Sequence, residues 1–409
     1  MDTVIVGAGQ AGLALSYYLT QKGHSHIVLE RVAQAGYALR NGRWDSFTLV
    51  TPNWTMKMPG DEYQGSEPDG FMGRAELLTY FEQYGEKFNL PIKYNTRVQS
   101  VEPDWHGRGF LIKTEKENFR AANVVIATGL YQRPKKPACS AKLPESIQQF
   151  HPGDYHNPKN LPEGAVLVVG SGQSGCQIAE ELYMAGRVVY LSTGQAGRIP
   201  RRYRGQDFYR WANETGYLDR TVDGLATPRS RFLGDPHLSG KDGGRSLNLH
   251  RFARDGVVLL GHIYDTDDGQ IRFVPDLREN LARSDRFEGQ ITREIDRYID
   301  KNGLKAPVEK LSQLRYGYKT KTCQKLDLKE AGIRAVVWAT GYQFDFRIVR
   351  LPIFDYDGYP IQKRGLTNWP GLYFLGLPWL VNQKSGLLMG VGEDAANIAS
   401  KIMTHKSQG

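Results

Sequence analysis

Two short glycine-rich loops carry the residue spacing that binds dinucleotide pyrophosphates. The first, GAGQAG, spans residues 7–12, and the second, GSGQSG, spans residues 170–175. In such a loop the first glycine permits a tight turn, the second lets the backbone approach the pyrophosphate, and the third lets a helix pack on a strand. The following helix directs unpaired N–H groups at the phosphates. Two loops, each between apolar β-branched strands, predict two bound dinucleotides.

The residues that end the second strand of each unit suggest which dinucleotide binds there. Glu30 ends the strand after the first loop, where a carboxylate can accept hydrogen bonds from both ribose hydroxyls. The corresponding strand after the second loop ends in Ser192 and Thr193, whose hydroxyls would not repel a 2′-phosphate. Guanidinium groups follow that could clamp a phosphate through two parallel hydrogen bonds. These are Arg198, Arg201, Arg202 and Arg204. The pattern favours FAD at the first loop and NADPH over NADH at the second, and leaves open which arginine binds the 2′-phosphate.

The cysteine content narrows what the reduced flavin can do. A hydride would pass from nicotinamide to flavin. Disulfide reduction would then need a redox cysteine pair, but Cys139, Cys176 and Cys323 form no CxxC motif and have no metal-ligand spacing. Reaction with O₂ needs only a dry pocket and a hydrogen-bonding group near the flavin.

The composition indicates the cellular environment of the protein and the class of its partners. The 409 residues carry a net charge of +9, which could indicate nucleic acid, but no nucleic-acid motif accompanies the arginine run. The scarce cysteines predict a reducing, cytoplasmic location. The sequence shows no signal peptide and no apolar run long enough for a membrane span. We therefore expect a small-molecule substrate together with O₂, no nucleic acid and no membrane span. The oligomeric state stays open, with a homodimer as one option.

The loops must be positioned by a repeated strand–helix–strand unit, at residues 3–31 and again at 165–193. This predicts an α/β fold with two Rossmann-like dinucleotide-binding domains, the NADPH domain being inserted into the FAD domain. The expected FAD-binding domain comprises 1–157 plus 331–409, and the NADPH-binding domain comprises 158–330. Two Ala-Thr-Gly (ATG) turns, at residues 127–129 and 339–341, mark the places where the chain crosses between the two domains. A hairpin is expected within 256–274, turning at Asp268–Gly269, and the longest helix at 276–303.

The chain resembles the class B flavoprotein monooxygenases, in the bacterial FAD/NADPH-dependent branch of the flavin-containing monooxygenase superfamily. The resemblance covers essentially the whole chain, through GAGQAG with Glu30, RWDSFTLVTPNW (43–54), the ATG turns, GSGQSG and the C-terminal GLYFLGLPW. The family signature F-x-G-x-x-x-H-x-x-x-Y/W keeps only its second half, at His151 and Tyr155, whereas Glu145 and Ile147 replace Phe and Gly. A terminal Tyr is typical of the N- and S-oxygenating branch, and a Trp of the Baeyer–Villiger branch.

The resemblance implies three catalytic-site residues. Asn53, in LVTPNW, would donate to the oxygenated flavin without protonating it; alternatively, it is a turn residue after a proline. His151 could be a general base, but the linker position favours positioning of domains and cofactor. Tyr155 completes the signature. Trp44 and Thr51 would neighbour the flavin, although core packing is an equal alternative for Trp44.

The expected cofactor contacts combine the loops, the strand ends and the resemblance. They are Gly7, Gly9, Gln10, Ala11, Gly12, Glu30, Arg31, Trp44, Thr51, Val98, Thr128, Gly129, Gly170, Ser171, Gly172, Gln173, Ser174, Gly175, Ser192, Thr193, Arg198, Arg201, Arg202, Thr340, Gly341 and Gly376.

Together these features imply an NADPH- and O₂-dependent FAD monooxygenase. It would oxygenate a soft nucleophile, an N- or S-containing small molecule, through a C4a-(hydro)peroxyflavin. Baeyer–Villiger oxidation of a ketone or aldehyde is an alternative of the same class. An NADPH oxidase-like reductase that releases peroxide and a flavin-based redox sensor with little turnover are others. The sequence does not identify the substrate.

Overall fold

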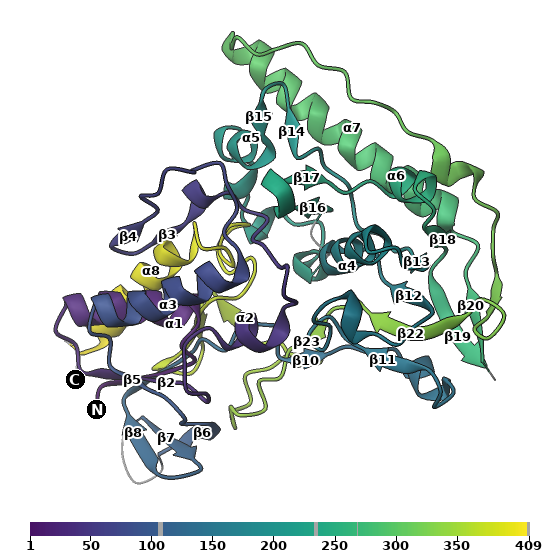
Figure 1. Cartoon of the computed structure of the whole chain (residues 1–409). Coiled ribbons are helices and arrows are strands. Elements are labelled where there is room, and N and C mark those ends of the chain that lie inside the picture. Colours follow the sequence, from purple (N-terminus) through teal and green to yellow (C-terminus); the bar gives the residue numbers. More distant parts are fainter. Residues whose placement is uncertain (105–108, 233–235, 268, 407–409) are drawn as a thin grey trace.

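The computed structural model describes residues 1–104, 109–232, 236–267 and 269–406, which form two lobes built around parallel sheets (Figure 1). The first lobe contains the N-terminal and C-terminal parts of the chain, and the N-terminus lies close to the end of the last helix there. The second lobe contains the middle of the chain. Helix α7 (Leu277–Asn302) runs along its outer edge.

The first lobe is organised by a seven-stranded sheet in the order β24-β25-β26-β9-β1-β2-β5. Its strands are β24 (Gln362–Lys363), β25 (Leu366–Thr367), β26 (Leu372–Phe374), β9 (Asn123–Ile126), β1 (Thr3–Val6), β2 (His26–Leu29) and β5 (Ile92–Lys93). The five strands from β26 to β5 pair in parallel. Helices α1 (Gln10–Gln21) and α8 (Val391–Lys406) pack on each other, and α3 (Arg74–Lys87) lies beside α1.

The second lobe repeats this design with a five-stranded parallel sheet in the order β11-β22-β12-β13-β18. Its strands are β11 (Gln148–Phe150), β22 (Ile333–Trp338), β12 (Ala165–Val169), β13 (Val189–Ser192) and β18 (Val258–Leu260). Helices α4 (Gln173–Met184) and α6 (Leu249–Arg254) contact this sheet. Strands β11 and β22 come from ranges that the sequence analysis gave to the FAD-binding domain, yet they pair with β12, so the chain leaves the second sheet only after Trp338.

Smaller elements surround the two sheets. The short helices are α2 (Tyr37–Gly42) and α5 (Phe208–Glu214), and the three-stranded sheets are β6 (Val98–Pro103), β7 (Phe110–Thr114), β8 (Asn118–Ala121) and β19 (Ile263–Asp267), β20 (Gln270–Phe273), β21 (Lys325–Asp327). The two-stranded pairs are β3 (Lys57–Met58) with β4 (Asp61–Glu62), β10 (Arg133–Pro134) with β23 (Tyr342–Gln343), β14 (Arg202–Tyr203) with β15 (Gln206–Asp207), and β16 (Leu238–Ser239) with β17 (Arg245–Ser246).

The structure confirms the α/β class, both strand–helix–strand units and the long helix. The predicted hairpin is present as β19 and β20, but β18, which the prediction had included, instead extends the parallel sheet. Asp268, the expected turn residue, lies outside the described residues. Every helix within the described ranges is too short or too polar to cross a membrane.

Candidate functional site

The two glycine loops have the same geometry in both lobes. Gly7 and Gly170 have φ of 109° and 104°, a region that favours glycine. A Cβ on Gly12 would lie 1.9 Å from the Gly7 oxygen, and one on Gly175 would lie 1.8 Å from the Gly170 oxygen. Each helix therefore packs directly on its own loop, as the spacing predicted.

The middle glycine of each loop borders open space. Gly9 caps α1 and Gly172 caps α4, neither with a side-chain hydrogen bond, and an added Cβ would meet nothing within 4 Å at either position. Such a helix end presents free N–H groups and a partial positive charge. Both loops are thus cradles that a pyrophosphate can enter.

Both ATG turns lie against the glycine loops. A Cβ on Gly7 would lie 2.8 Å from the Ala127 oxygen, and one on Gly170 would lie 2.5 Å from the Ala339 oxygen. The next glycines, Gly129 and Gly341, have φ of 69° and 86°. Thr128 accepts a hydrogen bond from Gln132 Nε2 at 2.7 Å, and Thr340 donates to the Lys135 carbonyl. The turns therefore bring the two chain crossings to the carboxyl edges of the sheets, where open α/β folds bind ligands.

Glu30 lies at the end of β2 beside the first loop. Its Oε2 accepts from the Ala8 N–H at 2.9 Å and its Oε1 from the Val32 N–H at 3.3 Å. The residue is 4% exposed, and burial raises the pKa of its carboxyl. This is the placement that ribose recognition requires. Arg31, in contrast, stacks its guanidinium 3.4 Å above the Tyr37 ring.

The C-terminal part of the chain closes over the first loop. Gln10 Nε2 donates to the Gly386 carbonyl at 2.8 Å, and a Cβ on Gly376 would lie 2.6 Å from the Ala11 Cβ. Gly376 has φ of 77°, which together with this contact explains the need for glycine. The Gln10–Gly386 contact joins residues 376 positions apart and could not be predicted from local sequence.

Asn53 has an unsatisfied polar atom in a buried position. It is 7% exposed, and its Nδ2 donates to the Glu67 carbonyl at 2.9 Å. Its Oδ1 has no hydrogen-bond partner within the described part of the chain. A buried acceptor without a partner costs about 1–3 kcal/mol. This arrangement fits an amide that a ligand completes, and Thr51, also buried, precedes it in the same segment.

Trp44 and Val98 are both buried. Trp44 belongs to the hydrophobic cluster of the second lobe, which also contains Tyr155 and Cys176, and it meets the Phe47 ring edge-on at 5.5 Å. Its surroundings favour the core-packing alternative. Val98 begins β6 and packs in the cluster of the first lobe.

His151 joins the linker to the second ATG turn. The residue is fully buried, and its Nε2 lies 2.9 Å from the Gly341 oxygen. Its Nδ1 accepts a long, 3.4 Å hydrogen bond from the Gly153 N–H, so Nε2 carries the proton and donates. Burial lowers the pKa of the imidazole, and the Tyr342 ring packs edge-on against it at 4.5 Å. These contacts support positioning.

Tyr155 is buried against α4. Its hydroxyl donates to Glu181 Oε2 at 3.0 Å, while the Ser46 hydroxyl donates to Glu181 Oε1 at 2.7 Å. Burial raises the pKa of the Tyr155 phenol, which therefore stays protonated as a donor. Sequence reasoning missed Glu181, which belongs to no motif.

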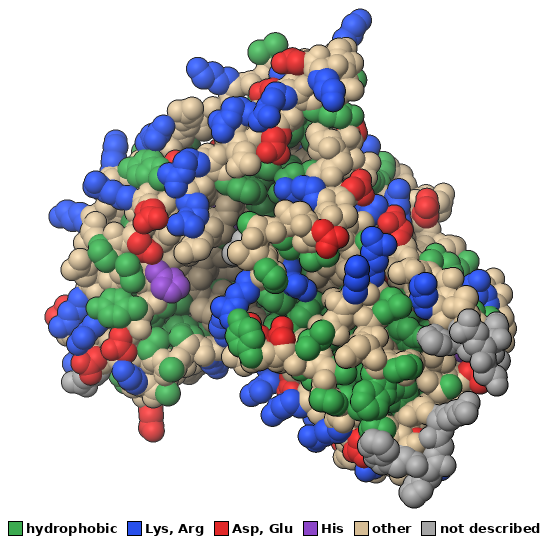
Figure 2. All heavy atoms as spheres, turned by 180° about the vertical axis from the view of Figure 1, so that it is seen from behind, with side chains coloured by type: hydrophobic (Ala, Val, Ile, Leu, Met, Phe, Trp, Pro, Cys, Tyr) green, Lys and Arg blue, Asp and Glu red, His purple; other side chains and the backbone are tan. Residues whose placement is uncertain are grey.

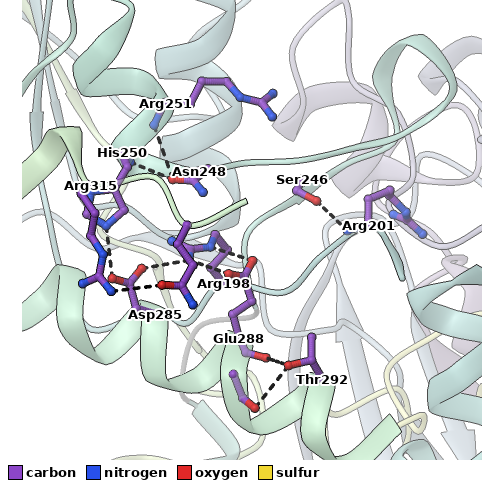
Figure 3. Close-up of polar contacts among 12 residues, drawn as sticks. Arg198, Arg201, Ser246, Asn248, His250, Arg251, Asp285, Glu288, Thr292 and Arg315 are labelled. Atoms are coloured by element: carbon purple, nitrogen blue, oxygen red, sulfur yellow. Dashed lines mark hydrogen bonds and ion pairs between the residues drawn. The ribbon is translucent and has the colours of Figure 1, made fainter. Parts of the chain in front are cut away.

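Two of the predicted phosphate-binding arginines are already neutralised inside the protein (Figure 3). Arg198 donates to Glu288 through Nε at 2.9 Å and Nη2 at 2.6 Å, and pairs with Asp285 at 2.9 Å. Arg201 forms a two-pronged pair with Asp207, at 2.6 and 2.7 Å, and is 2% exposed. This geometry speaks against both as phosphate ligands, because a phosphate would have to displace buried carboxylates.

Arg202 is exposed. It donates to the carbonyls of Gly243 and Gly244 at 2.8 and 3.2 Å and makes no ion pair with any residue the structure describes. Figure 2 shows that Lys and Arg side chains are scattered among acidic and apolar ones over the face drawn there.

Side chains around the second loop mostly make internal contacts. Ser192 donates to the Gly261 carbonyl at 2.9 Å and Thr193 to the Leu260 carbonyl at 2.7 Å. Ser171 accepts from the Gly194 N–H at 2.9 Å, and Gln173 from the Leu238 N–H at 3.2 Å. These bonds fix the shape of the strand end and of the loop. Ser174, at the start of α4, is half-buried and is therefore the hydroxyl best placed to contact a ligand.

The cysteines do not contribute a redox centre to this region. Cys176 is fully buried at the start of α4, where its thiol lies 3.4 Å from the Ser171 carbonyl and burial raises its pKa. All three cysteines are free thiols. Cys176 packs in the hydrophobic cluster of the second lobe, behind the glycine loop.

Comparison with known proteins places these features in context. The family model for pyridine nucleotide-disulphide oxidoreductases matches residues 4–206. The chain is 32% identical over 407 residues to an uncharacterized CzcO-like oxidoreductase of Geobacillus kaustophilus, covering 99% of both chains. The flavin-containing monooxygenase of Stenotrophomonas maltophilia has a similar fold, with a TM-score of 0.67 at 20% identity over 99% of this chain and 98% of that one. OTEMO in complex with FAD and NADP matches with a TM-score of 0.58 at 15% identity, over 100% and 86%.

Proposed function

Because this chain belongs to the CzcO-like oxidoreductases, flavoproteins related to the flavin-containing monooxygenases, we propose that it is an NADPH- and O₂-dependent FAD monooxygenase. The observation that carries the proposal is the pair of glycine loops. In each loop the middle glycine borders open space, while the first glycine packs against an ATG turn. FAD binds at the first cradle, beside Glu30, and NADPH at the second. Bound there, they supply hydride transfer and activation of O₂.

The residues of the first lobe fit FAD. Glu30 already accepts two backbone hydrogen bonds and keeps lone pairs for ribose hydroxyls. Gly9 leaves the end of α1 open to a pyrophosphate. Asn53 offers a buried amide with an unsatisfied oxygen and one free N–H, able to hydrogen-bond to the reacting part of the cofactor. A neutral, buried amide can donate a hydrogen bond to the cofactor without transferring a proton to it.

His151 and Tyr155 act as positioning residues in this proposal. His151 holds the linker on Gly341, in the turn that follows the second sheet, and Tyr155 holds it on Glu181 of α4, so the two ends of the segment 151–155 are fixed at different places. This constrains how the two cradles face each other. The catalytic roles of Asn53, His151 and Tyr155 and the division into an FAD-binding domain and an inserted NADPH-binding domain belong to this proposal, with the inserted unit extended to about 148–338 to include β11 and β22.

The substrate we propose is a soft nucleophile, an amine or a sulfur compound. Tyr155 at the end of the linker supports it, since the resemblance associates that residue with the N- and S-oxygenating branch. The contacts of His151 are consistent with it, because both ring nitrogens are engaged by backbone groups and a soft nucleophile needs no general base.

A rapid-mixing experiment tests the proposed function. The FAD-loaded protein is reduced with NADPH and mixed with O₂ while the flavin spectrum and hydrogen peroxide are followed. We expect a spectrum distinct from reduced and oxidised flavin, and its decay accelerated by an amine or thioether. Immediate return of oxidised flavin with one peroxide per NADPH would contradict monooxygenation, and absence of reduction by NADPH would point to a redox sensor.

A further inference from the structure

The residues that follow β13 lie along one face of α7. Asn280 Nδ2 donates to Thr193 Oγ1 at 3.3 Å, and a Cβ on Gly197 would lie 2.6 Å from the Phe287 ring. Arg198 continues this contact by pairing with Asp285 and Glu288 on the same helix (Figure 3). The segment 193–198 is therefore held on α7 at both of its ends.

Two polar atoms on α7 lie between these anchor points and lack partners. Positions three and four residues apart share a helix face, so Arg283 and Ser284 lie between Asn280 and Phe287. Arg283 Nε and Ser284 Oγ are buried and have no hydrogen-bond partner among the residues described. Ser284 is 2% exposed, whereas the Arg283 side chain is 40% exposed. The Arg283 guanidinium thus has a buried Nε but is partly exposed, on the helix that holds both ends of the segment 193–198.

Arg283 and Ser284 lie on the helix that packs against the end of the second strand, near which a dinucleotide presents its adenosine ribose. In Rossmann-like units the residue that ends the second strand meets the ribose, and a nearby cation accommodates a 2′-phosphate. Thr193 directly follows that strand here, but its hydroxyl already donates to the Leu260 carbonyl and accepts from Asn280. A phosphate near Arg198 would also meet two carboxylates, Asp285 and Glu288, so that site carries net negative charge.

The Arg283 guanidinium is only lightly engaged in the structure. Its one described partner is Glu279, one turn earlier on α7, at 3.2 Å, and the Glu279 side chain is 66% exposed. Exposed pairs of this kind are weak. A phosphate dianion with hydrogen-bonding geometry matched to guanidinium can therefore displace it.

We propose that α7 recognises the 2′-phosphate of NADPH through Arg283, with Ser284 lining the site beneath it. This inference rests on the proposed binding of NADPH at the second glycine loop. It moves the discrimination between NADPH and NADH from the arginine run at 198–204 to a helix about 80 residues further along the chain.

Calorimetric titration of the FAD-loaded protein with 2′,5′-ADP and with 5′-AMP tests the proposal without relying on turnover. We expect the wild type to prefer 2′,5′-ADP and Arg283→Gln to lose about tenfold or more of that preference, with 5′-AMP binding unchanged. Glu279→Gln, which removes the competing carboxylate, should strengthen 2′,5′-ADP binding about two-fold. Arg286→Gln, an exposed arginine on the same helix, is the matched control and should change neither ligand.

The outcomes distinguish the role of α7 from the binding of NADPH at the second glycine loop. A preference that persists in Arg283→Gln but disappears in Arg202→Gln overturns the role of α7 and leaves NADPH binding intact. Equal affinity of the wild type for both ligands also overturns it. Binding of neither ligand, with FAD retained, overturns the cofactor assignment of the second loop and this inference with it.

Discussion

The phenol of Tyr155 donates a 3.0 Å hydrogen bond to Glu181 on α4, and the second oxygen of the same carboxylate accepts from Ser46. One carboxylate thereby joins three segments: the linker that follows β11, the first helix of the second lobe, and the segment 44–49 that precedes α3. Tyr155 lies in the same cluster as Trp44, so polar and apolar contacts act at the same place. Tyr155, which the family resemblance places in a signature, thus has a structural role that is visible in its contacts.

Replacing Tyr155 by phenylalanine should loosen this junction. The change removes a buried hydrogen bond to a charged acceptor, and we expect the free energy of unfolding to fall by about 1.5–3 kcal/mol. Chemical denaturation measures this. If the junction also aligns the cradles, the KM for NADPH should rise while the spectrum of bound FAD stays unchanged.

Tyr264→Phe is the matched control for Tyr155. Its ring is 58% exposed, and a surface substitution of this kind should stay within about 0.5 kcal/mol of the wild type. A Tyr155→Phe protein with wild-type stability and a strongly reduced kcat would instead indicate that the phenol takes part in the chemistry.

Arg201 should behave as a structural residue and not as a phosphate ligand. Its guanidinium pairs with the buried Asp207, donates to the Val50 carbonyl at 2.7 Å and lies 4.5 Å from the centre of the Phe71 ring. Arg201→Gln leaves Asp207 without its counter-ion, which should lower the free energy of unfolding by about 3–5 kcal/mol. The ratio of NADPH to NADH affinity should stay unchanged.

Arg210→Gln provides the comparison for Arg201. Arg210 pairs with Asp69 at 2.7 Å, but both side chains are substantially exposed, so its loss should cost at most about 1 kcal/mol. Equal effects of the two substitutions on denaturant midpoints, or a selective loss of NADPH affinity in Arg201→Gln, would restore Arg201 as a candidate phosphate ligand.

The parts of the site that were predicted from sequence depend on short-range geometry. Gly7, Gly12 and Glu30 lie within one strand–helix–strand unit, where backbone sterics and strand length fix the outcome. The arginine run illustrates the opposite case. Four arginines in eight residues suggested a phosphate site, but the carboxylate that neutralises Arg198 is 90 residues away, on α7. Pairing over such distances depends on tertiary packing, which a local pattern does not contain.

The sheet to which β22 belongs was not predicted, for the same reason. The ATG pattern at 339–341 correctly marks the end of a strand at a crossing, yet the strand itself, β22, pairs with β12 and not with the first sheet. Its all-apolar sequence fits the interior of either parallel sheet. Glu181, Arg283 and the Gln10–Gly386 contact carried no motif that could have indicated them.

Asn53→Asp should uncouple NADPH consumption from oxygenation. The substitution places a carboxylate where the structure holds a neutral amide, and it removes the N–H donor beside the unsatisfied Oδ1 position. We expect hydrogen peroxide formed per NADPH consumed to rise well above the wild-type value. Asn41→Asp, on the exposed face of α2, should leave that ratio unchanged. An unaltered ratio in Asn53→Asp would reduce Asn53 to a turn residue.

The buried imidazole of His237 should make stability depend on pH. His237 lies beside the second glycine loop, fully buried, where its backbone N–H donates to the Gly197 carbonyl at 3.0 Å. Burial lowers the pKa of its side chain to about 4; the Ser171 carbonyl partly opposes this effect, and the Arg198 charge adds to it. In the unfolded chain the pKa is about 6.5. The unfolded state therefore binds the proton more readily, and folding stability falls as the pH drops from about 6.5 to 4.

The comparison of wild type with His237→Asn isolates this contribution. Both proteins keep the other titrating groups, including Asp394, whose carboxyl pKa burial raises to about 6 and which acts in the opposite direction. Between pH 7 and pH 4, the wild type should lose up to about 3 kcal/mol more of its free energy of unfolding than the variant does. Denaturant titrations at half-unit pH steps measure it. A difference that is constant across this range would show that His237 takes up its proton in the folded protein as easily as in the unfolded chain.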